Sequence, residues 1–137
     1  FGICLGLQLL FTKSEEFGSS QGLDLIKGSI KKFPTSLADN KIKIPHVCWN
    51  QVYTNNNSFN NTPLKDLKNY AFMYFVHSYY VKPENNLNIL TNTNYDGIEF
   101  CSSVLSENIF ATQFHPEKSG IEGLSIYKNW AISNNLI

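Results

Sequence analysis

The sequence predicts an α/β layered domain whose sheet is antiparallel in part or mixed. Three features of the 137-residue chain predict it: a strand, a tight turn and a helix within residues 1–13, a run of strands through residues 23–114, and a helix after residue 119. Strands and helices that each have one apolar face bury those faces by stacking into layers. Because the middle strands have no helices between them, they cannot all be parallel.

The first third of the chain is predicted to contain one helix and several short strands. Residues 14–22 are rich in Ser, Glu and Gly and predict a loop, whereas residues 23–33 predict short strands broken at Gly28. Residues 34–42 predict a second loop. The apolar side chains compatible with a buried face of the first helix are Leu5, Leu9, Leu10 and Phe11.

The rest of the chain is predicted to be rich in strands. A strand at residues 43–53 precedes an Asn-rich polar loop at 54–62, and Pro63 is expected to begin a short helix with Thr62 as its N-cap. The strongest strand signal, dense in aromatic and branched residues, covers residues 70–81. Further strands are predicted at residues 87–93, 98–104 and 108–114.

The last helix is predicted to begin at Ser119, because Ser119 and Glu122 have the spacing of a capping box. Apolar residues then recur at helical spacing, which predicts a buried face. The residues of that face are Ile121, Leu124, Tyr127 (or Lys128) and Ala131.

The composition excludes several classes of partner. Eleven Lys balance eleven acidic residues, and the chain has no Arg. There is thus no basic surplus for nucleic acid or an anionic membrane, and no apolar run approaches the roughly 20 residues that span a bilayer. Three widely separated cysteines predict a reducing, cytoplasmic location rather than a disulfide framework.

Gly2-Ile3-Cys4-Leu5-Gly6 has the spacing of a nucleophile elbow, with a thiol in place of the usual hydroxyl. In an elbow the nucleophile lies at a sharp strand-to-helix turn, and both glycines relieve clashes with the neighbouring strand and helix. The helix start would lower the pKa of the Cys4 thiol, and the Leu5 N–H would bind a developing oxyanion. The alternative is a buried structural cysteine, and a base elsewhere decides between the two.

His115 and Glu117 are the candidates for that base. Alternate residues of an extended segment point to the same side, and Pro116 prevents a helix at this point. The Glu117 carboxylate can bond one imidazole nitrogen and leave the other for a thiol. The chain therefore predicts a triad of Cys4 as nucleophile, His115 as base and then acid, and Glu117 as the orienting group. A loop with a surface ion pair is the alternative, and no ligand spacing predicts a metal site.

The two motifs resemble the catalytic signatures of class I (triad) glutamine amidotransferases. They read Gly-Ile-Cys-Leu-Gly-Leu-Gln at residues 2–8 and Gln-Phe-His-Pro-Glu at residues 113–117. Other segments resemble one branch of this family, the glutaminases that serve imidazole glycerol phosphate synthesis in histidine biosynthesis. These segments are residues 8–11, 14–16, 22–26, 45–50, 74–79 and 115–120.

The resemblance implies a flavodoxin-like three-layer fold with a mixed sheet, of which residues 1–137 would be the C-terminal portion of a single domain. The first strands and a Gly-containing oxyanion loop would lie upstream. We therefore expect this stretch of chain to be inactive or unstable by itself, because losing one oxyanion donor costs about 10²–10³ in rate.

The resemblance also implies an activity and a partner. Cys4 would attack the side-chain amide of L-glutamine, and ammonia would pass through a tunnel to a (β/α)8-barrel cyclase subunit in a heterodimer, with no cofactor. The residues implied to contact glutamine are Gln8, Glu16, Ser78 and Tyr79. The residues implied to lie toward the partner are Trp49, Tyr74 and Lys118, although for Trp49 and Tyr74 an ordinary place in the aromatic core is the alternative.

Three other functions remain open at this point. A paralogous amidotransferase would supply ammonia for amination of a surface-polysaccharide sugar. A non-catalytic interaction subunit would keep the fold without turnover, and a thiol hydrolase of different specificity would keep the nucleophile. Intact Cys4, His115 and Glu117 argue against the second, and Gln8 with the segment 74–79 argues against the third.

Overall fold

A mixed sheet forms the centre of the computed structural model, which describes residues 1–38, 40–55 and 59–137. Its strands are β1 (Gly2–Ile3), β2 (Phe11–Ser14), β3 (Ser20–Gln21), β4 (Ile26–Lys32), β9 (Tyr79–Pro83), β10 (Ile89–Tyr95), β11 (Ile98–Ser106) and β12 (Ile109–Thr112). Two smaller sheets pair β5 (Ser36–Leu37) with β6 (Asn40–Lys41), and β7 (His46–Val52) with β8 (Ala71–His77). The helices are α1 (Leu5–Leu9), η1 (Asn86–Asn88), η2 (Pro116–Lys118) and α2 (Gly120–Ser133).

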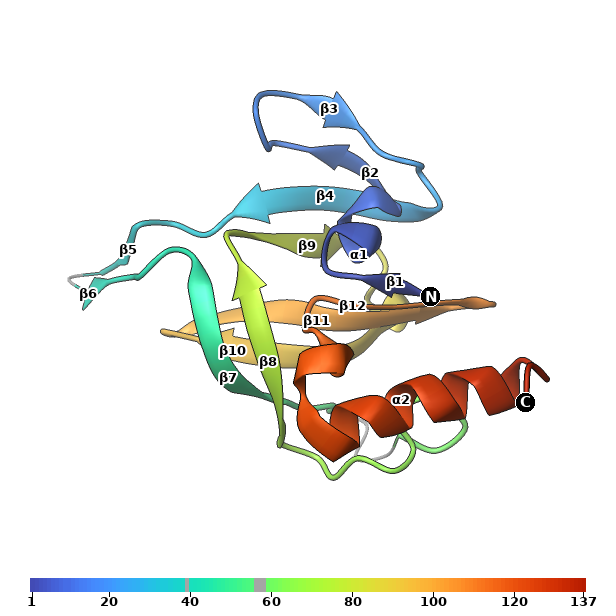
Figure 1. Ribbon diagram of the computed structural model, residues 1–137. Coiled ribbons are helices and arrows are strands. Elements are labelled where there is room, and N and C mark those ends of the chain that lie inside the picture. The colour runs from blue at the N-terminus through green and yellow to red at the C-terminus, as the bar shows by residue number, and fades with distance from the viewer. Residues whose placement is uncertain (39, 56–58) are drawn as a thin grey trace.

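The strand order of the central sheet is β1-β12-β11-β9-β4-β2-β3, with β10 on β11 (Figure 1). β1 is parallel to β12 and β2 is parallel to β4, whereas the other pairs are antiparallel. The predicted α/β class and mixed sheet are therefore confirmed. Among the described residues, no helix combines the length and the apolar character needed to cross a membrane.

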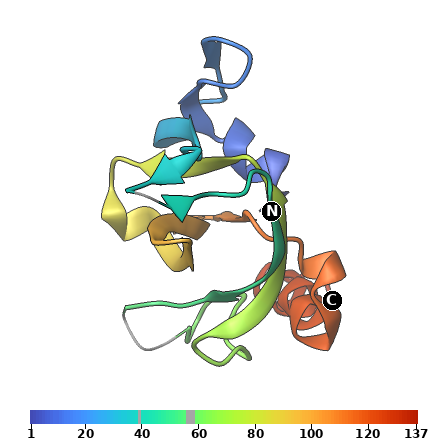
Figure 2. The same ribbon diagram turned by 90° about the vertical axis from the view of Figure 1, so that its left-hand side faces the viewer.

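The strand predicted at residues 70–81 is two strands in two different sheets. β8 pairs with β7 in a separate two-stranded ribbon, and β9 pairs with β4 and β11 in the central sheet. The chain changes direction at Ser78, whose carbonyl accepts a hydrogen bond of 3.0 Å from the Phe33 N–H. Figure 2 shows the ribbon curving away from the main sheet. The sequence hides this break, because both strands are equally rich in aromatic and branched residues.

Several other predicted boundaries are wrong. The segment after Pro63 forms hydrogen-bonded turns instead of a helix, with Thr62 Oγ1 accepting from the Leu64 N–H. Gly28 does not break its strand but lies within β4, at a φ of 148° and against the Lys82 carbonyl of β9. The predicted loop at 54–62 includes residues 56–58, which lie outside the described part of the chain.

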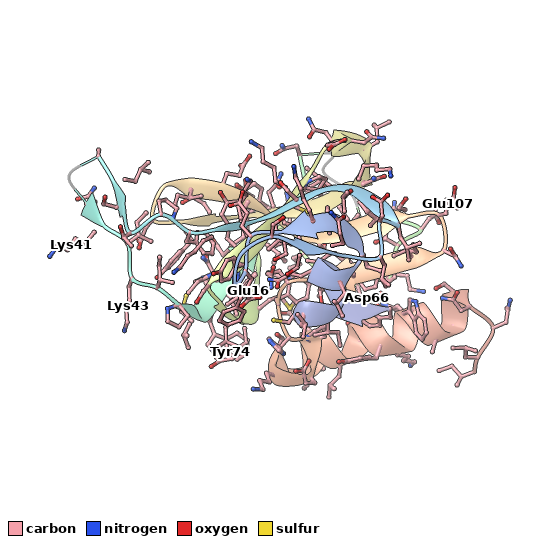
Figure 3. All side chains as sticks on the ribbon, turned by 90° about the horizontal axis from the view of Figure 1, so that it is seen from above. Glu16, Lys41, Lys43, Asp66, Tyr74 and Glu107 are labelled. Atoms are coloured by element: carbon pink, nitrogen blue, oxygen red, sulfur yellow. The ribbon has the colours of Figure 1, made fainter. Side chains whose placement is uncertain are left out.

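The predicted loops also contain short strands. β2 and β3 form in and beside the segment 14–22, and β5 and β6 form a small hairpin within 34–42. This hairpin carries Lys41 away from the rest of the molecule (Figure 3). The last three predicted strands are present with shifted ends, because η1 replaces the start of the first one and β12 ends at Thr112.

The buried face of α2 is not the predicted one. Ile121 and Leu124 are 87% and 57% exposed, whereas Gly123, Ile126 and Asn129 are buried. A Cβ at Gly123 would lie 2.1 Å from the Pro116 carbonyl oxygen, so a glycine is needed where α2 packs against η2.

The predicted capping box does not form either. The Ser119 hydroxyl donates to the His115 carbonyl at 2.6 Å and accepts from the Tyr74 N–H at 3.0 Å. In α1, Leu5 and Leu9 are about half exposed, and the buried residues are Leu7 and Gln8.

Two apolar clusters lie against the sheet. One joins α1 to the central strands through Leu7, Phe11 and Ile26. The other is strongly aromatic and fills the space between the sheet, the β7–β8 ribbon and α2. His46 and His77 are buried in this aromatic cluster, where Phe75 stacks on His46 at a ring separation of 4.9 Å.

The two buried histidines predict a loss of stability in mild acid. Burial lowers the pKa of His46 from 6.5 to about 4 and that of His77 to about 3. At pH values between these lowered pKa values and 6.5, both histidines are protonated in the unfolded chain but neutral in the folded chain. The free energy of unfolding therefore falls as the pH falls. Urea unfolding of the full-length protein should show this fall between about pH 6.5 and 5, where carboxylates contribute little.

The matched control is H46F/H77F, which should unfold with a flatter pH dependence in that interval. An equal slope in the wild type and the double variant would contradict the prediction.

Candidate active site

The parallel pairing of β1 with β12 brings the two catalytic motifs to one edge of the sheet. Ile3 lies beside Thr112, so the chain leaves both strands at their carboxyl ends. Cys4 follows Ile3 directly, its N–H donates to the Thr112 carbonyl at 2.7 Å, and His115 follows three residues after Thr112. Residues more than a hundred positions apart are thereby brought together.

Cys4 has the strained backbone of an elbow. Its φ of 51° and ψ of −102° lie outside the regions that non-glycine residues favour, at a cost of about 1–3 kcal/mol. A Cβ at Gly2 would approach the Gly6 carbonyl carbon to 2.8 Å, so Gly2 is needed for the close packing of β1 on α1. The role predicted for Gly6 is wrong, because a Cβ there would meet open space among the described residues.

The surroundings of the sulfur favour the protonated thiol. Cys4 Sγ lies 3.9 Å from the Val76 carbonyl, to which the thiol can donate, and Gln113 Nε2 donates to Sγ at 3.6 Å. Burial is the main cause that raises the pKa of Cys4, and it outweighs the opposing hydrogen bonds from the Leu5 N–H and Gln113. The predicted lowering of this pKa is therefore wrong for the free site: α1 has five residues, too few for a strong helix dipole.

His115 and Glu117 form the predicted pair. His115 Nδ1 donates to Glu117 Oε1 at 2.6 Å, and the hydroxyl of Tyr127 from α2 lies 3.3 Å from Oε2. Burial raises the pKa of Glu117, but the hydrogen bonds from His115 and Tyr127 outweigh it and lower the pKa overall. His115 Nε2 is buried and has no hydrogen-bond partner among the described residues. This ring nitrogen is thus free to bond a ligand or a nearby group.

The sulfur is not hydrogen-bonded to this imidazole in the free site. Among the described residues its side chain bonds instead to the Val76 carbonyl, the Gln113 amide and the Leu5 N–H. The Glu117 carboxylate is nevertheless close enough to raise the pKa of Cys4, which places the two motifs within one electrostatic environment. Catalytic hydrogen bonds of this kind are often long without substrate and tighten in the complex.

Gln8, Glu16 and Leu5 line one pocket of about 210 Å³ beside the elbow. Glu16 lies in the loop after β2, is half-buried, and is labelled in Figure 3. Gln8 Nε2 donates to the Tyr79 carbonyl at 3.1 Å and to Gln113 Oε1 at 3.3 Å. Both of its amide hydrogens are thus engaged, which leaves only Gln8 Oε1 to meet a ligand.

Ser78 and Tyr79 are half-buried at the turn between β8 and β9. Their carbonyls already accept hydrogen bonds, that of Ser78 from the Phe33 N–H and that of Tyr79 from Gln8 and His77. Neither residue lines the pocket beside the elbow. The Tyr79 carbonyl thus already accepts two hydrogen bonds, whereas the Ser78 carbonyl has room for one more, so the predicted contact of Tyr79 with glutamine requires another group.

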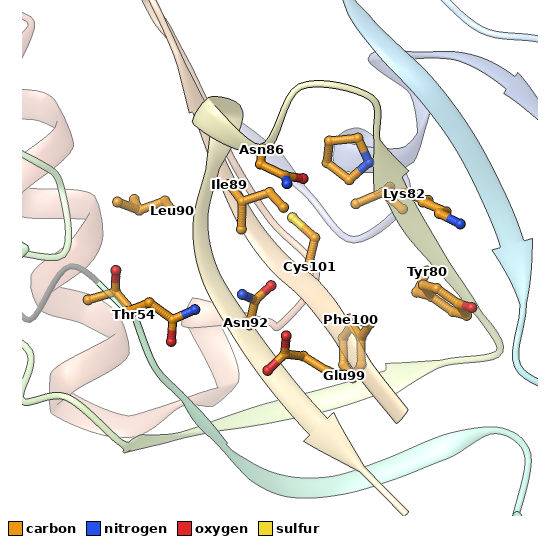
Figure 4. Close-up of a pocket in the computed structure, with 13 residues that line it drawn as sticks. Thr54, Tyr80, Lys82, Asn86, Ile89, Leu90, Asn92, Glu99, Phe100 and Cys101 are labelled. Atoms are coloured by element: carbon orange, nitrogen blue, oxygen red, sulfur yellow. The ribbon is translucent and has the colours of Figure 1, made fainter. Parts of the chain in front are cut away.

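A larger cavity of about 500 Å³ lies elsewhere, between β9, β10 and β11 (Figure 4). Polar and apolar side chains line it, including Lys82, Asn92, Glu99 and Cys101. Burial raises the pKa of Cys101 to about 12, so its thiol is not a nucleophile at neutral pH. The cavity contains none of the predicted site residues. Within the described residues, no group of three or more His, Cys, Asp or Glu is arranged to hold a metal ion.

The outer face of the β7–β8 ribbon is an exposed apolar surface. Trp49 lies opposite Tyr74 with their rings 6.1 Å apart, and the Lys118 ammonium lies 5.8 Å from the centre of the Tyr74 ring. Val47, Trp49 and Phe72 are each about half exposed. Trp49 is therefore not a core residue.

Sequence reasoning missed four residues of these sites. Gln113 belongs to a recognised motif, yet its spacing does not reveal the contact with the sulfur, and the helical pattern assigns Tyr127 only to a helix face. Val47 and Phe72 extend the ribbon surface. Strand alternation from Trp49 and Tyr74 is the signal that could have found both.

A family model described as glutamine amidotransferase class-I matches residues 1–134. Proteins named imidazole glycerol phosphate synthase subunit HisH are similar as well. That of Geobacter metallireducens is 46% identical over 136 residues, covering 96% of this chain and 62% of the relative. That of Pyrococcus furiosus is 43% identical over 129 residues, covering 94% and 62%. The chain thus spans about three fifths of the length of these relatives.

The fold resembles a crystal structure of a Thermoplasma acidophilum protein described as belonging to GMP synthase. The TM-score is 0.62 at 18% identity, covering 98% of this chain and 57% of the other. At that identity the likeness concerns the fold alone.

The elbow geometry predicts opposite outcomes for its two glycines. In the full-length protein, Gly2→Ala should lower the free energy of unfolding by about 1–3 kcal/mol and slow alkylation of Cys4, because the new Cβ pushes on α1. Gly6→Ala should be neutral or stabilise the protein by up to about 1 kcal/mol, because Ala is the better helix former. Urea unfolding and iodoacetamide labelling measure both. Equal damage at the two positions would contradict the elbow geometry.

Proposed function

Because the chain belongs to the class I glutamine amidotransferase family, we propose that it carries the catalytic centre of a glutaminase. One observation carries the proposal: a strained Cys4 lies at the same sheet edge as His115, whose Nε2 is unpaired among the described residues and whose Nδ1 is held by Glu117. The relatives named as HisH support the same class of enzyme.

The proposed reaction begins with proton transfer from Cys4 Sγ to His115 Nε2. The thiolate then attacks the side-chain carbonyl carbon of glutamine, a C–S bond forms, and the electron pair moves to the carbonyl oxygen. The Leu5 N–H stabilises this oxyanion. His115 passes its proton to the amide nitrogen, which leaves as ammonia, and a glutamyl thioester remains.

Hydrolysis of the thioester completes the cycle. His115 Nε2 takes a proton from water, hydroxide attacks the thioester carbon, and glutamate leaves as the thiol is restored. Glu117 keeps Nδ1 protonated throughout, so the bare nitrogen faces the reaction. The net change is glutamine plus water to glutamate plus ammonia. Gln8 Oε1 and the Glu16 carboxylate can only accept hydrogen bonds, so they suit the α-ammonium group of the substrate.

We further propose that the ammonia serves a (β/α)8-barrel cyclase subunit that makes imidazole glycerol phosphate in histidine biosynthesis, in the cytoplasm. The relatives' names support the pathway. The barrel would dock on the ribbon surface, which we define as Val47, Trp49, Phe72, Tyr74 and Lys118. An exposed aromatic surface beside a cation has the composition of an interface centre.

The alternative acceptor is a surface-polysaccharide sugar that a paralogous synthase would aminate. The triad and the pocket suit both acceptors equally, so the distinction rests on the relatives' names, which favour the histidine pathway. A non-catalytic role is disfavoured by the retained strain at Cys4 and by the oriented imidazole.

The triad predicts a graded loss of glutaminase activity in the full-length protein with its cyclase partner. Cys4→Ala should abolish glutamate release, because the sulfur that forms the thioester is removed. Glu117→Gln should lower kcat by roughly 10²- to 10⁴-fold, because it disturbs the imidazole tautomer. Tyr127→Phe is the matched control and should cost less than about tenfold, since it removes only one hydrogen bond to Glu117. Wild-type rates in Cys4→Ala would disprove the proposal.

The ribbon surface predicts where the partner binds. Trp49→Ala should weaken association with the cyclase subunit by about thirtyfold or more, because a central tryptophan of an interface contributes about 2 kcal/mol. Leu87→Asp is the control, since Leu87 is 88% exposed in η1 and is not part of the ribbon surface. Titration calorimetry measures both. An unchanged Kd for Trp49→Ala would place the partner elsewhere.

A further inference from the structure

The buried histidines form a pair with one defined arrangement of protons. His46 Nδ1 lies 2.9 Å from His77 Nε2, and His77 Nδ1 lies 2.8 Å from the Tyr79 carbonyl oxygen. A carbonyl oxygen only accepts hydrogen bonds, so His77 Nδ1 carries the proton. Burial lowers the pKa of His77 to about 3, and the ring is therefore neutral. Its bare Nε2 must accept from His46 Nδ1.

The same reasoning fixes the other end of the pair. Burial lowers the pKa of His46 to about 4, so its Nε2 is bare and accepts from Asn50 Nδ2 at 3.3 Å. The Asn50 amide is itself oriented, because Nδ2 donates to the Asn94 carbonyl at 2.9 Å and Oδ1 accepts from the Gln51 N–H at 2.8 Å. The donors of the pair therefore all point from β7 toward Tyr79.

The Tyr79 carbonyl joins the histidine pair to the elbow helix. Gln8 Nε2 donates to it at 3.1 Å and also to Gln113 Oε1 at 3.3 Å. With its oxygen occupied in this way, Gln113 turns its Nε2 to the sulfur of Cys4 at 3.6 Å. Both glutamine side chains are buried. A continuous path of hydrogen bonds thus runs from Asn50 on β7 to the nucleophile.

The Gln113 amide, which donates to the sulfur at the end of this path, favours the thiolate, and several other groups favour the thiol. The groups that favour the protonated thiol are Glu16 from the loop after β2, Glu117 from η2, and the Val76 carbonyl of β8. His115 is the other ionisable group of this cluster. Among the described residues, the donors that favour the thiolate are the Leu5 N–H and the Gln113 side chain. An incorrectly oriented Gln113 would present its oxygen and repel the thiolate.

We propose that His77, Gln8 and Gln113 form a positioning relay that fixes a hydrogen-bond donor on the sulfur of Cys4. Gln113 alone touches the reacting atom, and His77 acts through the Tyr79 carbonyl and Gln8. The relay rests on the proposed function for the use of the thiolate. Its own observable is the ionisation of the thiol, which can be measured without turnover.

The first test is the pH profile of Cys4 alkylation by iodoacetamide in the full-length protein. Mass spectrometry identifies the labelled cysteine. Gln113→Leu should move the midpoint to higher pH and slow alkylation below the midpoint by about tenfold, because a donor to a charged group is lost. An unchanged midpoint would overturn the relay.

The second test separates positioning from packing at His77. His77→Phe keeps an aromatic ring but loses the donor that fixes the direction of the Tyr79 carbonyl, so Gln8 loses a fixed acceptor and alkylation should slow by about threefold. His77→Asn carries an amide N–H near the position of Nδ1 and should restore most of the wild-type profile. Equal profiles for the two variants would show that the donor has no effect. If His77→Phe fails to fold, His77→Asn alone tests the relay. An alkylation midpoint of His77→Asn shifted as far as that of Gln113→Leu would contradict it.

Asn129→Ala is the control for a general loss of stability. Asn129 is buried and hydrogen-bonded to the Pro63 carbonyl and Asp66, away from the relay. It should lower the free energy of unfolding and leave the alkylation midpoint unchanged, and a shifted midpoint would overturn the inference. Glutamine hydrolysis is measured in parallel. If the wild type fails to hydrolyse glutamine, the proposed function fails, whereas normal hydrolysis with unshifted variants refutes only the relay.

Discussion

The site depends on one constraint, the parallel pairing of β1 with β12. Two residues of β1 are enough to set the register, with Ile3 beside Thr112. That register brings Cys4 and His115 out of the sheet at the same edge, and the Cys4 N–H is itself bonded to the Thr112 carbonyl. The placement of Cys4 and His115 at one edge of the sheet rests on these few backbone hydrogen bonds.

The sulfur is held in a balance between burial and donors. Burial and nearby carboxylates raise the pKa of Cys4, whereas the Leu5 N–H and the Gln113 amide lower it. The surroundings of Cys4 therefore favour a thiol rather than a permanent thiolate. Under the proposed function, such a nucleophile would be activated when the substrate tightens the geometry and would be protected from chance alkylation until then.

The local parts of the site were predictable, and the distant ones were not. The elbow and the pair of His115 and Glu117 depend on spacings of two residues, which the sequence displays directly. The break at Ser78 depends on which sheet each half joins, and the local pattern is the same on both sides. The buried face of α2 depends on the fit of Gly123 against Pro116, and the spacing of apolar residues along the helix does not predict that contact.

The alternation of side chains along β8 has a consequence for how such proteins diversify. Phe72 and Tyr74 point outward, whereas Met73, Phe75 and His77 point into the core and toward the relay. In the proposed complex, changes at the outward positions would alter which synthase is recognised without disturbing the thiol. Under the proposed function, one short strand would allow the acceptor of the ammonia to be exchanged during evolution while the chemistry that releases it is inherited unchanged.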